Sequence, residues 1–157
     1  VTQVGASKNN FISILVSKNS TADGSVLFAN NEDDSGINLF NWYKVPRLTH
    51  HKRANISLIN GGQIPQVNET YSFLWLEMPG KTFSDSYMNE WGVTIASNFC
   101  QSKEDSPDLL NSGIGYYLRR IMAERAKSAK EAVKIAGSIV DSIGYAICTI
   151  TRLNTTS

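Results

Sequence analysis

Residues 11–33 constrain the fold more than any other stretch, because they read as two apolar strands joined by a polar turn. Residues 11–16 and 26–29 are short runs rich in β-forming residues. Asp23-Gly24 marks the turn between them, since glycine tolerates a positive φ. The second strand leads into residues 30–34, which are all Asn, Asp or Glu. Because strands that deliver polar groups at their ends commonly build sites, we expect a candidate site there.

The composition indicates one globular domain. The chain has 157 residues, of which 41% are hydrophobic and 18% charged, which suits a moderate core and excludes a disordered chain. Its 15 basic and 14 acidic residues nearly balance, so we expect no nucleic-acid partner. No apolar run is long enough to predict a membrane span. We expect a disordered lead-in at residues 1–10, a single domain over 11–150 and a polar tail at 151–157.

Further strands follow the first hairpin. An aromatic cluster at residues 39–43 should end at Val45-Pro46, because proline keeps the preceding residue extended. Residues 71–76 read as a strand, and residues 86–96 as a hairpin with a tight loop from Asn89 to Gly92. Residues 145–150 predict a final strand.

Two helices are expected between residues 110 and 144. The first has apolar residues at helical spacing, namely Leu110, Ile114, Tyr117, Leu118, Ile121 and Met122. The charged residues Arg119, Arg120, Glu124 and Arg125 should lie mostly off that stripe. In the second helix, Ser128 and Glu131 form a capping box, and Gly144 stands at the C-terminal cap position. Its apolar face comprises Ala132, Ile135, Ala136, Ile139, Val140 and Ile143.

The metal-binding and redox signals are weak. Residues 50–53, His-His-Lys-Arg, contain both histidines of the chain, so a zinc site would lack histidines for its remaining ligands, and we interpret the run as a solvated strand edge. Cys100 and Cys148 are expected to be separate small buried thiols, with a disulfide between them as the alternative. We predict no metal ion and no cofactor.

Several motifs resemble the dipeptidase and secernin family of cysteine N-terminal nucleophile (Ntn) hydrolases. The first hairpin carries them as Leu15-Val16, Lys18, residues 22–25 (Ala-Asp-Gly-Ser) and residues 31–33 (Asn-Glu-Asp). Remote matches are residues 63–71, the Met-Asn-Glu-x-Gly-Val run at 88–93, and the Tyr-x-x-Arg-Arg and Glu-Arg-Ala segments of the first helix. The resemblance covers residues 11–146 and corresponds to the amino-terminal third of a family member.

The resemblance implies a mechanism that begins with a terminal cysteine. In the family, its thiol attacks a peptide carbonyl, its own α-amine with a pKa near ~8 accepts the proton, and donors stabilise the oxyanion. Asp33 matches the carboxylate that holds the amine, and Asn31 matches the Asn two residues before it. Phe11 occupies the nucleophile position and has no nucleophilic atom. Asn30 stands where related amide hydrolases often have an arginine.

Other chemistries are less well supported by the residues. Three residues could substitute as the nucleophile, namely Ser13, Thr2 and Cys100, and none is favoured. The family tolerates a serine at the position of Ser13 beside its cysteine, nothing around Thr2 matches a site, and Cys100 matches an ordinary loop or strand-end position. A calcium loop would use Asn31, Asp33, Ser35 and Gly36, yet Trp42 stands where the closing glutamate belongs. A solvated turn or a vestigial active-site rim is the preferred interpretation.

We therefore expect an α+β fold with antiparallel sheets and two C-terminal helices, part of the four-layer αββα sandwich of Ntn hydrolases. The resemblance implies a dipeptidase homologue or fragment whose own hydrolysis of dipeptides or small peptides is lost. The alternative is a non-catalytic structural or subunit module. Since strands expected from the family are missing, an open sheet edge and face should make the chain a homo-oligomer or the partner of another subunit.

Overall fold

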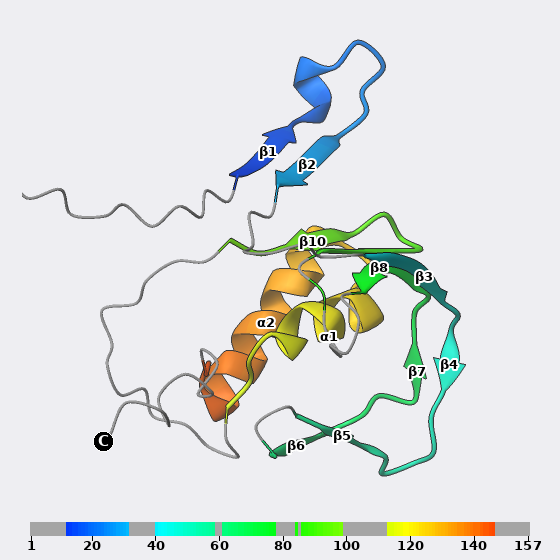
Figure 1. Ribbon diagram of the computed structural model, residues 1–157, viewed down its shortest axis with the longest axis vertical. Coiled ribbons are helices and arrows are strands. Elements are labelled where there is room, and N and C mark those ends of the chain that lie inside the picture. The colour runs from blue at the N-terminus through cyan, green and yellow to red at the C-terminus, as the bar shows by residue number, and fades with distance from the viewer. Residues whose placement is uncertain are drawn as a thin grey trace, which may run out of the picture.

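The computed structural model describes residues 12–31, 40–58, 61–77, 84, 86–98 and 113–146. They form a mixed α+β structure with antiparallel strand pairs and two helices towards the C-terminus (Figure 1). The early strands are β1 (Ile12–Val16), β2 (Leu27–Asn31), β3 (Asn41–Val45), β4 (Leu48–Thr49) and β5 (Asn55–Ser57), with a 3-10 turn η1 (Lys18–Ser20) after β1. Then come β6 (Gln63–Pro65), β7 (Glu69–Thr70), β8 (Phe73–Glu77), β9 (Ser86–Asn89), β10 (Thr94–Ala96), α1 (Tyr117–Arg125) and α2 (Ala129–Ile143).

A four-stranded antiparallel sheet in the order β10-β9-β8-β3 is the centre of the molecule. Both helices lie on one side of it (Figure 1). Because side chains alternate along a strand, Phe73 and Trp75 of β8 are buried towards the helices and Leu74 and Leu76 project from the opposite face. The sheet therefore has one closed face and one open face.

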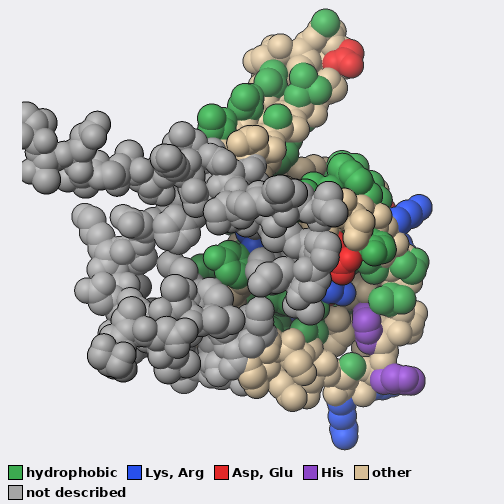
Figure 2. Space-filling view, in the orientation of Figure 1, with side chains coloured by type: hydrophobic (Ala, Val, Ile, Leu, Met, Phe, Trp, Pro, Cys, Tyr) green, Lys and Arg blue, Asp and Glu red, His purple; other side chains and the backbone are tan. Residues whose placement is uncertain are grey.

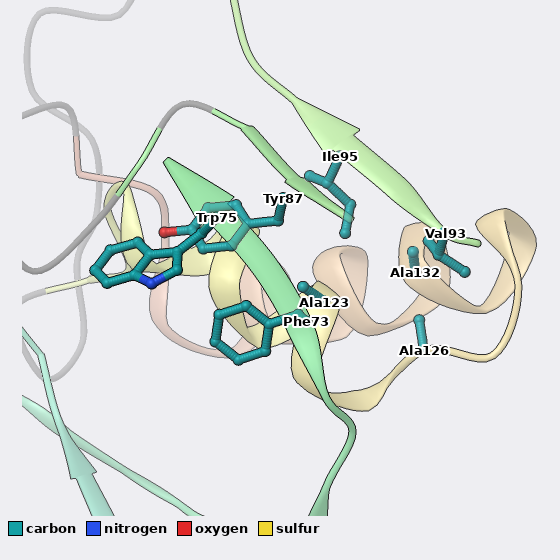
Figure 3. Packing of buried hydrophobic residues seen from close by; sticks show 8 residues of the cluster. All are labelled: Phe73, Trp75, Tyr87, Val93, Ile95, Ala123, Ala126 and Ala132. Atoms are coloured by element: carbon teal, nitrogen blue, oxygen red, sulfur yellow. The ribbon is translucent and has the colours of Figure 1, made fainter. Parts of the chain in front are cut away.

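The closed face forms the main hydrophobic core (Figure 3). Its buried members come from β8, β9, β10 and α1, from the residues that precede β10 and follow α1, and from the first turn of α2. They are Phe73, Trp75, Tyr87, Val93, Ile95, Ala123, Ala126 and Ala132. The alanines allow the helices to approach the sheet closely, and the large aromatic rings of β8 and β9 fill the remaining space.

A second, smaller core lies where the β5–β6 hairpin meets the helices. Ile56, Leu58 and Ile64 pack there with Ile114 and Ile121, and all five are buried. The partly buried apolar face of α2 completes it through Ile135, Ile139, Val140 and Ile143. This face of α2 is the one predicted from the sequence.

The predicted first hairpin is confirmed. β1 and β2 pair antiparallel from Ile12 opposite Asn31 to Val16 opposite Leu27. Gly24 adopts a φ of 73°, and the Ser25 amide donates to the Asp23 carboxylate at 3.0 Å, which fixes the turn. The hairpin projects from the rest of the described chain (Figures 1 and 2), and its apolar side chains are exposed.

The prediction that the first helix includes Ile114 was wrong. α1 begins at Tyr117, after Tyr116 in a right-handed helical conformation, and Ile114 lies before the helix in an isolated β-bridge. Gly113 has a φ of 66°, and Ile114 exchanges backbone hydrogen bonds with Gly144 and Ala146 at 2.9 and 2.8 Å. Leu110 lies outside the described residues. The predicted final strand is seen only as the isolated parallel bridge between Ile114 and Tyr145, since residues 147–150 also lie outside.

Both caps of α2 are as predicted. The Glu131 amide donates to Ser128 Oγ at 3.2 Å, and the Glu131 carboxylate accepts from the Lys127 amide at 2.8 Å. Gly144 ends the helix with a φ of 77° and donates its amide to the Val140 carbonyl. Among the described residues, no helix has the length and apolar character needed to cross a membrane.

The predicted tight loop after β9 is confirmed. Its first residue, Asn89, also makes hydrogen bonds to the end of α1. Asn89 is buried, and its Oδ1 accepts from the Trp91 and Val93 amides, each at 3.0 Å. Its Nδ2 donates to the carbonyls of Ala123 at 3.0 Å and Ala126 at 2.6 Å. These carbonyls lie at the end of α1, where the helix offers them no partner. One side chain thus closes the loop and caps the helix.

Substituting Asn89 should destabilise the fold strongly. Asn89→Ala leaves the Trp91 and Val93 amides and two buried carbonyls without this partner, so we expect a loss of about 2–4 kcal/mol in the free energy of unfolding. Asn89→Asp keeps the acceptor but loses the donor and should be at least as damaging. Urea denaturation measures both, with the exposed Asn68→Ala as the control. Equal stability of Asn89→Ala and the control would contradict this role.

The cap of α2 should contribute a smaller amount. Ser128→Ala removes the side-chain acceptor of the Glu131 amide and should cost about 1 kcal/mol. Ser138→Ala, on the exposed side of the same helix, is the matched control and should change stability by less than about 0.5 kcal/mol. Thermal or urea unfolding of the pair gives the difference, and indistinguishable midpoints would show that the cap contributes nothing.

Candidate functional site

The open end of the first hairpin holds the described part of the predicted site. Asn31 is the last residue of β2, is exposed, and lies opposite Ile12, the first residue of β1. Phe11 directly precedes Ile12 in the sequence. Phe11 and Asp33 lie outside the described residues, as do Glu32, Asp34 and both cysteines. Of the predicted site residues, only Asn31 is therefore placed.

A polar chain next to this end links the hairpin to the central sheet. Ser13 Oγ donates to Asn30 Oδ1 at 2.7 Å and accepts from Asn98 Nδ2 at 3.1 Å. Asn98 follows β10 and is 85 residues from Ser13 in the sequence. The pairing of Ser13 with Asn30 follows from the hairpin register, so the sequence contained that signal. Nothing in the spacing indicated Asn98.

The chemistry of Ser13 argues against its use as a nucleophile. A serine hydroxyl needs a neighbouring base to accept its proton. The hydrogen bonds described for Ser13 join it to two carboxamides, which do not act as bases near neutral pH. The arrangement instead provides donors and acceptors at an exposed surface, suited to holding a strand or a peptide group.

The described residues contain no cluster of metal-binding side chains. Across the described parts of the chain, no group of three or more His, Cys, Asp or Glu residues is placed to hold a metal ion. Asn31 is the described member of the calcium loop considered from the sequence, and Asp33, Ser35 and Gly36 lie outside the described residues.

The basic run at residues 50–53 is a turn between β4 and β5, so its interpretation as a strand edge was wrong. Arg53 has a φ of 67°, which an extended strand does not allow. His50 Nε2 lies 3.0 Å from the buried hydroxyl of Thr70 on β7, which holds the turn against the neighbouring strand. His51, Lys52 and Arg53 are exposed.

A second group of polar side chains lies between α1 and β8. The sequence predicts that the charged residues of this helix lie mostly off its apolar face. Arg119 and Glu124 are instead almost completely buried. Arg120 pairs with Glu124 at 2.8 Å, and its guanidinium carbon lies 5.3–5.8 Å from the ring centres of Phe73, Trp75 and Tyr117. The aromatic rings thus accommodate a partly buried cation through their faces, and the buried glutamate compensates its charge.

Tyr87 extends this cluster through a ring stacked on Trp75. Its hydroxyl accepts a hydrogen bond from the Ser84 amide at 2.8 Å. Burial raises the pKa of Tyr87 to about 12, because the phenolate would lose its hydration, although Arg119 and Arg120 act in the opposite direction. We interpret the cluster as a structural layer between sheet and helix.

Comparison with known proteins does not assign the chain to a family. No family model and no curated protein matches it. The resemblance to dipeptidases and secernins therefore stays a prediction based on sequence motifs, and function has to be inferred from those motifs and from the local chemistry of the hairpin.

The pKa of Tyr87 predicts how stability changes in alkali. The folded chain favours the neutral phenol, so this contribution is complete below pH 10 and is lost as the pH rises from 10 through about 12. The loss should be on the order of 2–3 kcal/mol. Urea denaturation at pH 9 and pH 11.5 measures it. Tyr87→Phe should be less stable at pH 9, because Ser84 loses its acceptor, but should lose less on alkalinisation. An equal loss in both proteins would contradict the assignment.

Proposed function

We propose that this chain is a dipeptidase-family homologue that does not itself hydrolyse dipeptides. The observation that carries the proposal is the pairing of Ile12 with Asn31 in a two-stranded hairpin. The residue before Ile12, which the motifs match to the nucleophile, is Phe11. A benzyl side chain cannot attack a carbonyl or form a thioester, so the first step of the family's reaction has no starting atom.

The surroundings of Ser13 support the same conclusion. It lies in β1 and is the nearest described hydroxyl along the chain to the nucleophile position. Its partners Asn30 and Asn98 orient the hydroxyl but cannot accept its proton in an acyl-transfer step. Substitution of a serine mechanism for the cysteine mechanism is therefore not favoured.

A non-catalytic structural or subunit module is the second candidate. The exposed apolar side chains of the hairpin favour it, because β1 and β2 leave Ile12, Ile14, Leu15, Leu27 and Phe28 accessible to water. A two-stranded hairpin has little stability by itself, so such a surface is better explained by a protein partner than by a small substrate.

Incubation with a panel of dipeptides tests the enzymatic proposal. We expect no release of free amino acids above the buffer control when products are quantified by mass spectrometry. Turnover that iodoacetamide abolishes would overturn the proposal, since it would require an active thiol. Turnover that resists iodoacetamide but disappears in Ser13→Ala would overturn it through a serine nucleophile.

A variant with Phe11→Cys separates the two candidates. Residues 1–10 are removed by a protease, so that the new cysteine carries the free α-amine that the mechanism needs. Appearance of thiol-dependent turnover would support the dipeptidase lineage. Continued inactivity in a folded variant would favour the structural module. The same truncated chain with Phe11 retained is the matched control.

A further inference from the structure

One edge of the central sheet is unpaired among the described residues. β3 is the last strand in the order β10-β9-β8-β3, so its inner side pairs with β8 and its outer side pairs with no described strand (Figure 1). The first hairpin contacts the sheet near the opposite edge, where Asn98 follows β10. β3 has five residues, from Asn41 to Val45, which is an ordinary length for a strand that pairs on both sides.

Hydrogen bonds at the end of β9 show the direction of the backbone groups in this sheet. The Asn89 amide donates to the Val93 carbonyl, on the side of β10, and the Glu90 amide donates to the Ser72 carbonyl, on the side of β8. Successive residues of a strand direct their backbone groups to alternate sides. In β8, Ser72 and every second residue after it therefore bond towards β9, and the residues between them bond towards β3.

The same alternation leaves two residues of β3 with outward backbone groups. Tyr43 lies opposite Trp75, and these two residues bond across the gap between β3 and β8. Trp42 and Lys44 flank Tyr43, so the N–H and C=O groups of both face away from β8. No turn, loop or long-range backbone hydrogen bond is described for either residue. Donors and acceptors that repeat at this interval are matched by another extended chain, which has the same repeat.

The side chains next to these groups restrict the chemistry of such a chain. Trp42 is 72% exposed, and Lys44 is exposed as well. The described ion pairs are made by Arg47 and Arg120, so the Lys44 ammonium has no carboxylate partner among them. Oppositely charged and apolar side chains attract each other when they lie opposite on neighbouring strands. The edge therefore favours a strand with a carboxylate opposite Lys44 and an apolar side chain opposite Trp42.

A second copy of the chain fits this edge less well than an acidic strand. Two β3 strands related by a twofold axis at Tyr43 would place Lys44 of each copy opposite Trp42 of the other. The two lysines would then be diagonal neighbours, about 7–8 Å apart, with no carboxylate between them. A lysine on an edge strand commonly prevents pairing of this kind.

We propose that the outer edge of β3 binds an extended segment of another protein, with an acidic residue opposite Lys44 and an apolar residue opposite Trp42. The segment runs antiparallel to β3, as the strands of this sheet do, so its sequence has the order acidic residue, any residue, apolar residue. The backbone bonds supply affinity, and the two side chains supply specificity. The proposal depends on the open edge and not on the dipeptidase lineage, so either can fail without the other.

Fluorescence anisotropy of a labelled probe peptide tests the proposal on the whole chain. The probe is acetyl-Thr-Thr-Glu-Thr-Phe-Thr-Thr-amide, and we expect saturable binding with a dissociation constant of about 10 µM to 1 mM, because a single strand buries little surface. A probe with a methyl group on the phenylalanine amide nitrogen lacks one backbone donor and should bind about tenfold more weakly. Absence of saturable binding, or equal binding of the methylated probe, would overturn the proposal.

An exchange of charges tests the register. Lys44→Glu should weaken binding of the probe about fivefold, and a probe with lysine in place of glutamate should recover that loss. Lys52→Glu makes the same charge change in the exposed turn after β4 and is the matched control, with binding expected to stay unchanged. Equal weakening by the two variants, or no recovery with the lysine probe, would contradict the pairing of Lys44 with a carboxylate.

A pair of substitutions at Trp42 tests the backbone pairing from the side of the protein. Trp42→Pro removes an outward amide hydrogen that the sheet does not use, so the chain should stay folded but lose probe binding. Trp42→Val removes the indole and retains the amide, and should retain part of the binding. Circular dichroism confirms that each variant is folded, and the methylated probe decides the question if Trp42→Pro is not. Equal binding by the two folded variants would contradict strand addition.

Sedimentation velocity of the chain without peptide distinguishes the remaining occupant. Self-association that Trp42→Pro abolishes and Trp42→Val does not would assign the edge to a second copy and would overturn the proposal. We expect neither substitution to change the sedimentation of the chain alone.

Discussion

Four hydrogen bonds made by the buried Asn89 side chain hold the sheet and the end of α1 together. Its carboxamide has two donor and two acceptor positions, and each one is used. The acceptors close the loop between β9 and β10, while the donors hold the carbonyls at the end of α1. Neighbouring backbone bonds, from Tyr71 to Glu124 and from Glu90 to Ser72, join the same region. Loop, helix end and sheet are therefore fixed by one buried group.

The layer of aromatic rings and charged side chains beneath the sheet depends on that arrangement. Once α1 is positioned against β8 and β9, Arg120 lies among three rings and pairs with Glu124. Removing only one charge of such a pair would leave the other buried without compensation, which is costly. The pair therefore contributes more to the positioning of α1 than to net stability.

The local features of the fold were predictable because each has a local cause. The turn at Gly24, the loop closed by Gly92 and the cap at Ser128 follow from backbone conformations or hydrogen bonds within a few residues. The start of α1 was not predictable, because Ile114 is held in an extended conformation by residues 144–146. Periodicity placed it on a helical stripe, but a long-range pairing decided its conformation.

In the candidate site, too, local contacts were predictable from the sequence and long-range contacts were not. The hairpin register, which the sequence predicts, places Ser13 opposite Asn30 and Ile12 opposite Asn31. The contact of Ser13 with Asn98 depends on where the whole sheet lies, and no spacing in the sequence encodes that. The burial of Arg119 and Glu124 was likewise missed, because charge alone does not indicate when aromatic neighbours will accommodate it.

The distance along the chain between the hairpin and its contact in the sheet also affects how the protein is made. Ribosomes add about 5–20 residues per second, so the 85 residues from Ser13 to Asn98 require roughly 4–17 seconds. During this interval β1 and β2 can pair with each other, but the strand that leads to Asn98 has not yet been synthesised and the hairpin lacks this contact. The newly made segment therefore exposes isoleucine and leucine side chains at the stage when nascent chains most readily bind chaperones or one another.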